Sequence, residues 1–383
     1  MAHHSSRLSE AASVPAVKQN RIGNAVRGNV KRDQEHAALG PFLSTGSTLL
    51  NLALSDRWYG GLLAGNYYLF VGDSTSGKTL MSLSCLAEAC VDSAFSEHRL
   101  IYDGAEHGCL FDLEKMFSKS IADRIEAPEY DNGVPVYSQV LEEFYFKLAD
   151  LCDEAESGGG RPFVYVLDSM DVLKCAAENK RFDKAKKAFE SKGESEESGY
   201  MVQKARVNSE GLRRMMGPLA ATNSILIILS QTRANLGFGF STKTRSGGHA
   251  LEFYATCEIW SSVIKSLKKT VNGRPRRIGV TSRFRLSKNR ITGKLHDVAV
   301  DLLPSFGVDD LGSCIDFLVE EKHWKKARGG VSAVEMNVVM QREALIREIE
   351  RRGVEDRMRR LVGKKWREIQ RASSVDRKRR YAD

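Results

Sequence analysis

The sequence lacks any apolar run close to the roughly 18 residues that a membrane-spanning helix needs. Its first residues also lack the apolar segment of a secretory signal. The seven cysteines are scattered without a Cys-x-x-Cys pair, so neither a zinc site nor a disulfide framework is indicated. With 383 residues and 42% hydrophobic content, the chain is long enough to bury a large core. We therefore expect a soluble, cytoplasmic protein with reduced thiols.

Acidic residues are missing from one long segment. Residues 259–296 contain eleven Lys or Arg and no Asp or Glu. Residues 341–383 are also basic, with 15 Lys or Arg against 8 Asp or Glu, in a chain whose net charge is +9. Basic segments attract the phosphate backbone of nucleic acids. A solvated helix surface explains the charge of 341–383 equally well, whereas the acid-free segment favours a nucleic-acid partner.

The strongest motif is G-x-x-x-x-G-K-T, which follows an apolar segment at 67–71 and precedes a helix-forming segment at 80–89. A strand, a glycine-bounded loop and a helix in this order are the setting of a phosphate-binding loop. Its backbone N–H groups would surround phosphate oxygens at the positive end of the helix. Lys78 would reach the β- and γ-phosphates, and the Thr79 hydroxyl would bind Mg²⁺. The predicted ATP-binding loop comprises Gly72, Asp73, Ser74, Thr75, Ser76, Gly77, Lys78 and Thr79.

Two further apolar segments end near an acidic residue. Residues 100–103 are followed by Glu106. Ligands of doubly wound parallel sheets bind at the carboxyl ends of the strands, so Glu106 is a candidate to activate the water that attacks a γ-phosphate. An exposed surface carboxylate fits the spacing equally well. Residues 163–167 are followed directly by Asp168, which would help to hold Mg²⁺ opposite the phosphate loop.

A fourth apolar segment, 225–229, ends near Gln231, which could sense the γ-phosphate, with a capping amide as the alternative. The following loop, 232–251, is rich in glycine and contains two Phe, four cations counting His249, and no acidic residue. This composition is typical of a loop that follows a nucleic-acid backbone. An ordinary surface loop is the alternative.

Strand segments that alternate with helical segments predict an α/β fold with a mostly parallel twisted sheet flanked by helices. An alternating segment at 280–286 predicts an antiparallel extension of this sheet. We divide the chain into an N-terminal arm at 1–40 that could contact another protomer, an ATPase core at 41–310, and a small basic helical region at 311–383 that could contact duplex DNA.

Several motifs occur in the order found in the RecA recombinase family, which the chain resembles over residues 44–324. They are Ser-Thr-Gly-Ser at 44–47, the phosphate loop, Ala-Glu-His at 105–107, Leu-Asp-Ser at 167–169, Ser-Gln-Thr-Arg at 230–233, Ser-Gly-Gly-His-Ala-Leu-Glu-Phe-Tyr-Ala at 246–255 and Ser-Lys-Asn-Arg at 287–290. The last two are the specific ones, because many ATPases share the phosphate loop. The chain is more similar to the bacteriophage branch, which includes UvsX-type recombinases, than to the bacterial housekeeping protein. That branch would place it in the host cytoplasm.

The resemblance implies a RecA-type P-loop ATPase core that uses ATP and Mg²⁺. It implies a helical homo-oligomeric filament on single-stranded DNA, pairing with homologous double-stranded DNA, strand exchange, and ATP hydrolysis stimulated by DNA.

Residue roles also follow from the resemblance. Glu106 would activate water, and Gln231 would link the γ-phosphate to the DNA-binding loop. Lys288 and Arg290 would reach ATP across the protomer interface and stabilise charge on the transferred phosphoryl group. The resemblance does not identify the residue that stacks on adenine, and Phe111 is our candidate because it lies on the segment just after Glu106. Loops matching about 191–200 and 233–247 would contact DNA, the second through Arg233, Asn235, Phe238, Lys243, Arg245, Gly247 and Gly248.

The sequence departs from the bacterial pattern at three places. Arg290 stands where bacterial members have Lys, which keeps the charge but changes its geometry. The first DNA loop carries Glu194, Glu196 and Glu197, which weakens its expected contact with DNA. The C-terminus is basic, whereas bacterial members often end in an acidic tail that restrains duplex binding.

Two other functions compete with a recombinase. The first is a hexameric RecA-core helicase or DNA motor, which we disfavour because about forty leading residues leave no space for a helical collar domain. The second is an ATP-switched scaffold that coats DNA without hydrolysis. The intact set of Lys78, Thr79, Glu106, Asp168 and Gln231 argues against the scaffold.

The basic C-terminus predicts weak self-restraint toward duplex DNA. Removal of residues 341–383 is expected to lower duplex affinity, because it removes cations that attract phosphates. Fluorescence anisotropy with labelled duplex at several salt concentrations measures the change. Equal affinity before and after removal would contradict the prediction.

Overall fold

The computed structural model describes residues 40–109, 111–157, 159–181, 183–184, 200–234, 243–245, 248–378 and 380–381, with 200–202, 233–234 and 243–245 described by their backbone alone. Most of the predicted N-terminal arm, 1–39, therefore lies outside the described residues. The elements below all belong to one unit, Phe42–Asp383.

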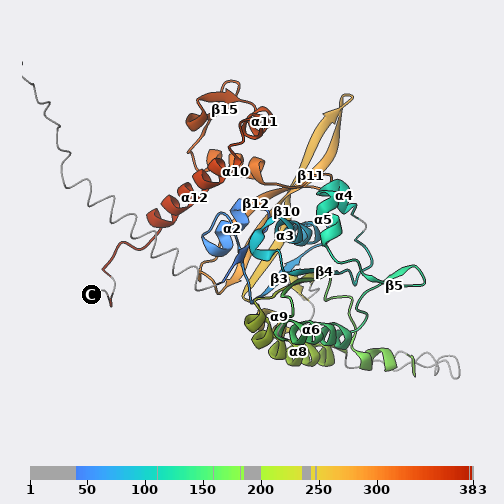
Figure 1. Ribbon diagram of the computed structural model, residues 1–383. Coiled ribbons are helices and arrows are strands. Elements are labelled where there is room, and N and C mark those ends of the chain that lie inside the picture. Colours follow the sequence, from blue (N-terminus) through green and yellow to red (C-terminus); the bar gives the residue numbers. More distant parts are fainter. Residues whose placement is uncertain are drawn as a thin grey trace, which may run out of the picture. The chain divides into compact units, whose positions relative to one another are not determined.

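A nine-stranded sheet crosses this unit (Figure 1). Its strands are β3 (Tyr67–Gly72), β4 (Arg99–Asp103), β7 (Phe163–Leu167), β8 (Ile225–Ala234), β9 (Lys243–Arg245), β10 (Cys257–Val271), β11 (Arg274–Asn289), β12 (Asp297–Leu303) and β13 (Gly307–Asp309). The strand order is β13-β12-β11-β10-β3-β8-β7-β4, and β9 pairs with β8. Strands β10, β3, β8, β7 and β4 run parallel, and β11, β12 and β13 add antiparallel neighbours. The predicted α/β class and the mostly parallel sheet are confirmed.

Helices cover both faces of the parallel strands. Alternate residues of β3 point to opposite faces: Tyr68 and Phe70 join one buried cluster, and Tyr67, Leu69 and Val71 join the other. The first cluster includes α2 and α3 and the second includes α6 and α8, which lie on opposite sides of the sheet in Figure 1. A strand buried on both faces has to be apolar throughout, which explains the continuous apolar segments. The helices are α2 (Thr48–Ser55), α3 (Lys78–Val91), α6 (Leu141–Glu156) and α8 (Tyr200–Thr222).

Short elements connect these layers. They are β1 (Phe42–Leu43), β2 (Leu62–Leu63), the 3₁₀ turn η1 (Ser93–Phe95), α4 (Leu113–Met116), α5 (Lys119–Arg124), β5 (Glu129–Asp131), β6 (Val134–Val136) and α9 (His249–Tyr254). Ser47 caps α2 through its side chain, which accepts the Leu50 N–H.

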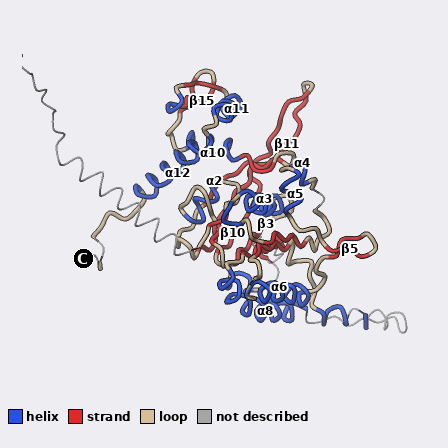
Figure 2. Tube along the Cα trace, viewed as in Figure 1, coloured by secondary structure: helices blue, strands red, loops and turns tan. Residues whose placement is uncertain are grey.

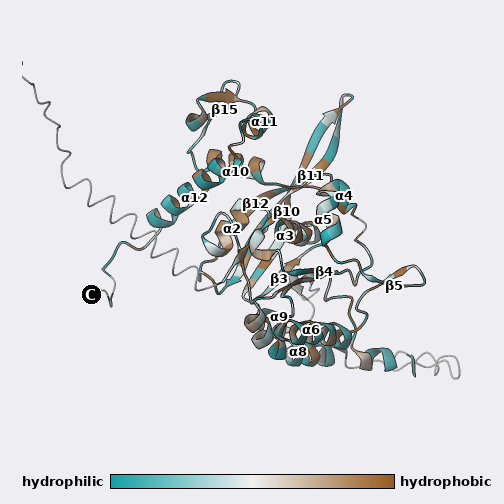
Figure 3. Ribbon diagram, viewed as in Figure 1, coloured by the Kyte–Doolittle hydropathy of each residue, from teal (hydrophilic) through white to brown (hydrophobic). Residues whose placement is uncertain are grey.

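The antiparallel part is longer than the sequence analysis expected. Strands β10 and β11 pair from Cys257–Asn289 outward to Val271–Arg274, and a turn at Asn272 and Gly273 with positive φ joins them. The Asn-Gly pair is a strong hairpin signal that the sequence analysis did not use. The outer part of this ribbon is hydrophilic (Figure 3) and carries six exposed cations: Lys265, Lys268, Lys269, Arg274, Arg276 and Arg277.

The region after residue 310 is not purely helical, which differs from the predicted pattern. Helix α10 (Asp310–Glu320) is followed by a small antiparallel sheet of β14 (Lys325–Ala327), β15 (Gly330–Ala333) and β16 (Val338–Met340). The turn η2 (Val334–Met336) joins β15 to β16. Helices α11 (Arg342–Arg352) and α12 (Glu355–Ala372) complete it (Figure 2). The strands have three or four residues each, too short for a periodic pattern to distinguish them from loops.

Helix α12 packs against the core. Met358, Val362 and Trp366 are buried in the cluster that also contains α2 and α3. The Trp366 Nε1 donates to Asp56 Oδ1 at 3.1 Å, and Arg359 Nε donates to Asp310 Oδ2 at 3.0 Å. Removal of 341–383 would therefore also remove core residues. Neutralising the exposed Lys364, Arg367 and Arg371 tests the duplex-affinity prediction without that loss.

We predict that Trp366→Ala lowers the free energy of unfolding by about 3–5 kcal/mol, because it leaves a cavity and an unpaired Asp56 oxygen. Denaturant unfolding followed by circular dichroism measures this change. Val375→Ala, at a side chain that is 73% exposed, is the matched control and should change stability by less than about 0.5 kcal/mol. A loss below about 1 kcal/mol for Trp366→Ala would contradict the packing described here.

Candidate nucleotide site

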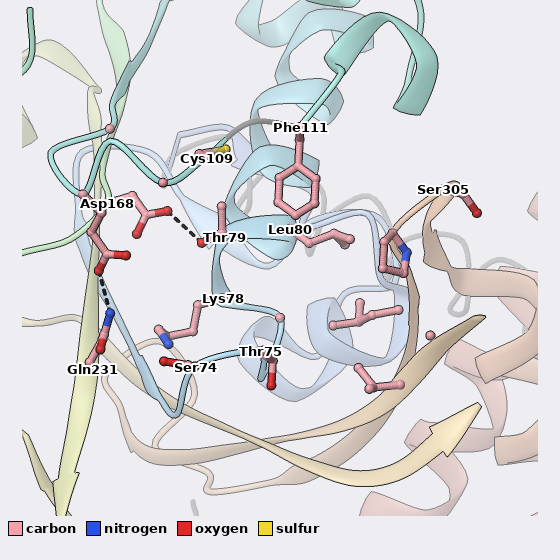
Figure 4. A pocket seen from close by; sticks show the side chains of 18 of the residues that line it. Ser74, Thr75, Lys78, Thr79, Leu80, Cys109, Phe111, Asp168, Gln231 and Ser305 are labelled. Atoms are coloured by element: carbon pink, nitrogen blue, oxygen red, sulfur yellow. Dashed lines mark hydrogen bonds between the residues drawn. The ribbon is translucent and has the colours of Figure 1, made fainter. Parts of the chain in front are cut away.

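A cavity of about 800 Å³ lies at the carboxyl ends of the parallel strands (Figure 4). It is lined by the predicted loop and helix residues Ser74, Thr75, Gly77, Lys78 and Thr79, by Glu106, Asp168 and Gln231 from the ends of other strands, and by Phe111. Four segments predicted separately thus meet at one cavity. The cavity also contains residues that the sequence analysis did not assign: Leu80, Tyr102, Gly104, Gly108, Cys109, Arg277, Ile278, Gly279, Val280, Leu302, Pro304 and Ser305.

Two glycines shape the loop between β3 and α3. Gly77, immediately before α3, has φ +92°, a left-handed conformation that other residues rarely adopt. A Cβ at Gly72 would collide with Ser261 and Ser76, and one at Gly77 would collide with Leu302. Both positions therefore require glycine. The loop is open on the cavity side, where backbone N–H groups at the start of a 14-residue helix can meet an anion.

Lys78 is almost fully buried at the first position of α3. Its Nζ donates to the carbonyl oxygens of Gly72 at 2.8 Å and Asp73 at 2.9 Å. Burial lowers the pKa of Lys78, and the nearby Asp168 and Glu106 carboxylates oppose that effect. The loop's own carbonyls thus hold the ammonium over the cavity, where an anionic phosphate could exchange for them.

Asp168 forms the second polar centre of the cavity. Its Oδ2 accepts hydrogen bonds from Thr79 Oγ1 at 2.7 Å and from Tyr102 OH at 2.8 Å. Burial raises the pKa of Asp168, and the hydrogen bonds from Thr79 and Tyr102 act in the opposite direction. These hydroxyl and carboxylate oxygens are hard ligands of the kind that Mg²⁺ prefers, with room in the cavity for phosphate and water to complete its shell. Within the described residues, no cluster of three or more His, Cys, Asp or Glu could hold a metal by itself.

Glu106 and Gln231 meet at the cavity edge. Glu106 Oε1 accepts hydrogen bonds from Gln231 Nε2 at 2.7 Å, drawn in Figure 4, and from Ser169 Oγ at 2.5 Å. The backbone N–H of Gln231 donates to Asp171 Oδ2 at 2.6 Å. The sequence analysis gave no role to Ser169, which it quoted only as part of a motif, and it missed Asp171, because no pattern in the neighbouring residues distinguishes Asp171 from a surface residue.

Lys288 and Arg290 do not line the cavity of their own chain. Through β10, Lys288 is in register with Leu69, in the middle of β3, whereas the phosphate loop follows the carboxyl end. Lys288 Nζ donates to the carbonyls of Glu252 and Phe253, and Arg290 Nη2 donates to that of Phe253 at 2.9 Å. Burial lowers the pKa of Lys288, and the charge of Arg290 lowers it further.

Most of the residues assigned to DNA lie outside the described residues or are described by their backbone alone. Asn235, Phe238 and Gly247, like the first DNA loop at 191–199, lie outside the described residues, and the side chains of Arg233, Lys243 and Arg245 are not described. The backbone shows Arg233 opposite Thr244 where β8 and β9 pair, two residues after Gln231 in β8. Gly248 has φ +82° at the start of α9, where a Cβ would press on Ala205 of α8.

The mostly parallel α/β sheet, with a cavity at the carboxyl ends of its strands, is compatible with a RecA-type core. Residues 185–309 match the family model of the RecA N-terminal domain. This segment is about a third of the chain and includes Gln231, Lys288 and Arg290, while the phosphate-loop motif lies before it. The match supports membership in the RecA family, whose members are DNA-dependent ATPases. In the part of the chain that the structure describes, no helix is long and apolar enough to cross a membrane.

Asp168 allows a stability test. Its pKa is higher in the folded protein than in the unfolded chain, so the folded state loses stability as pH rises from the usual carboxyl range through the folded pKa. We expect Asp168→Asn to raise the free energy of unfolding at pH 8 in the absence of nucleotide, because it removes the charge that burial disfavours. The Asn oxygen can still accept from Thr79 and Tyr102.

Denaturant unfolding at pH 8 and pH 5 measures this effect, with Asp150→Asn on the exposed face of α6 as the control. The gain should shrink as the pH is lowered, because protonation of Asp168 removes the charge whose burial raises its pKa. A loss of stability at pH 8 would contradict the account of its burial.

Proposed function

We propose that the protein is an ATP-dependent DNA recombinase of the RecA family, from the UvsX-like bacteriophage branch. It forms filaments on single-stranded DNA and catalyses homologous pairing and strand exchange. The observation that carries the proposal is the convergence of Lys78, Thr79, Asp168, Glu106 and Gln231 at one cavity, in a chain that matches the RecA N-terminal domain.

The residues that we predicted to bind nucleotide each have a role in ATP hydrolysis. The loop N–H groups and Lys78 bind the phosphates, and Thr79 and Asp168 hold Mg²⁺, which neutralises charge on the phosphate oxygens when it is bound. Glu106 takes the proton of the attacking water, while Gln231 and Ser169 hold its carboxylate in place. Phe111, which is 38% exposed and lines the far end of the cavity, stacks on adenine together with the apolar surface of Leu302 and Pro304.

Lys288 and Arg290 act from a neighbouring protomer in this proposal. Neither residue lines the cavity of its own chain, and Lys288 is in register with the middle of β3, so a second copy would have to bring them to the phosphates. ATP would then lie between protomers and stabilise the filament. In the free chain both cations are held by carbonyls at the end of α9, from which an anionic phosphate can draw them.

DNA binding is assigned to the loop between β8 and β9 and to the exposed cations of the β10–β11 ribbon and α12. Gln231 lies in β8 shortly before the residues that pair with β9, so a shift of this residue toward the γ-phosphate would move the loop between the two strands. ATP and DNA would therefore favour the same filament state, which is the coupling that the function needs.

The test is steady-state ATP hydrolysis with and without single-stranded DNA, with the same samples imaged for filaments. We expect stimulation by DNA together with filaments in the wild type. Lys78→Ala should abolish hydrolysis because it removes the phosphate cation. Gln231→Ala should keep ATP binding but lose the stimulation, because the loop and the nucleotide become uncoupled. Lys147→Ala, at an exposed position on α6, is the control and should behave as wild type.

Three outcomes contradict the proposal. Rings that unwind duplex DNA would identify a helicase, and filaments without turnover would identify an ATP-switched scaffold. Full stimulation in Gln231→Ala would refute the coupling role of this residue.

A further inference from the structure

Lys204 connects helix α8 to the loop that follows β7. It lies near the start of α8, and its Nζ donates to three carbonyl oxygens: Met170 at 2.9 Å, Asp171 at 3.1 Å and Leu173 at 2.8 Å. An ammonium group has three N–H donors, so these bonds use all of them. A single side chain from α8 therefore fixes the backbone of the loop at 170–173.

The same loop contacts the end of β8. The Met170 N–H donates to Leu229 O at 3.0 Å, and the Asp171 carboxylate accepts the backbone N–H of Gln231 at 2.6 Å. The Gln231 side chain then donates to Glu106 at 2.7 Å. A continuous chain of hydrogen bonds thus runs from Lys204 through Asp171 and Gln231 to Glu106.

We propose that Lys204 and Asp171 are positioning residues that set the place of Gln231 and, through it, of the Glu106 carboxylate. The inference rests on the proposed function, because its consequence is the rate of ATP hydrolysis. Asp171 acts on the backbone of Gln231 and leaves its side-chain amide available for Glu106 or a phosphate.

A purely structural role predicts a different result. If Lys204 only stabilised the fold, its loss would lower the free energy of unfolding without a selective effect on kcat. A positioning role predicts a fall in kcat at unchanged KM for ATP, because neither Lys204 nor Asp171 lines the cavity. Small displacements of catalytic groups cost large factors in rate.

The experiment compares four variants with wild type in DNA-stimulated ATP hydrolysis. Lys204→Met removes the ammonium and keeps the length of the side chain. Lys204→Arg keeps the charge, but its planar donors diverge and do not converge on three carbonyls. Asp171→Ala removes the acceptor for the Gln231 N–H, and Asp171→Asn keeps an oxygen that can accept it. Lys147→Ala is the control.

We expect Lys204→Met and Asp171→Ala to lower kcat by about tenfold, with KM for ATP within about twofold of wild type. Lys204→Arg should lie between Lys204→Met and wild type, and Asp171→Asn should recover most of the rate. If Lys204→Met does not fold, the two Asp171 variants decide the question. Values of kcat within about twofold of wild type for Asp171→Ala, or equal losses in Asp171→Ala and Asp171→Asn, would overturn the inference.

Hydrogen exchange at the Gln231 N–H separates this inference from the proposed function. In nucleotide-free protein, exchange should be faster in Asp171→Ala than in Asp171→Asn or wild type, because the acceptor is lost. Unchanged exchange would overturn the inference even in an active enzyme. A wild type that shows no ATP hydrolysis with DNA overturns the proposed function and the rate effect with it.

Discussion

The parallel pairing of β3, β8, β7 and β4 is the constraint on which the candidate site depends. Parallel strands all end at the same edge of the sheet, so the side chains that follow them meet there although they are far apart in the sequence. The hydrogen bond between Gln231 and Glu106 joins residues 125 positions apart, and the one between Thr79 and Asp168 joins residues 89 apart. Loss of register at one strand would separate these pairs, because the face of each residue alternates along a strand.

The polar groups of the cavity satisfy one another in the free protein. Lys78 is bonded to the carbonyls of its own loop, Thr79 to Asp168, and Gln231 to Glu106. Lys78 and Asp168 are buried, and buried polar groups without partners are costly, so their bonds offset the burial of charge. They also hold each group close to the place where the proposed chemistry needs it. Nucleotide binding would exchange these internal partners for phosphate and metal, with little rearrangement of the fold.

Local patterns were sufficient for much of the fold and for part of the site. The apolar segments at 67–71, 163–167 and 225–229 became the buried strands β3, β7 and β8, because strands covered on both faces need an unbroken apolar composition. Glycine spacing located the loop before α3. The small sheet β14–β16 was missed because its strands are shorter than any detectable period. Tyr102 and Asp171 were missed because nothing in their neighbours along the chain distinguishes them from core or surface residues.

The sequence by itself determined the class of fold, the position of the phosphate-loop motif and the basic segments, since each of these follows from spacing or composition over a few residues. The tertiary structure decided which polar residues share the cavity. It placed Glu106 beside Gln231, where the spacing fitted a surface carboxylate equally well, and it placed Lys288 and Arg290 away from the cavity of their own chain. The physical reason is that strand order and register are set by contacts between segments distant in the chain, and no local pattern records those contacts.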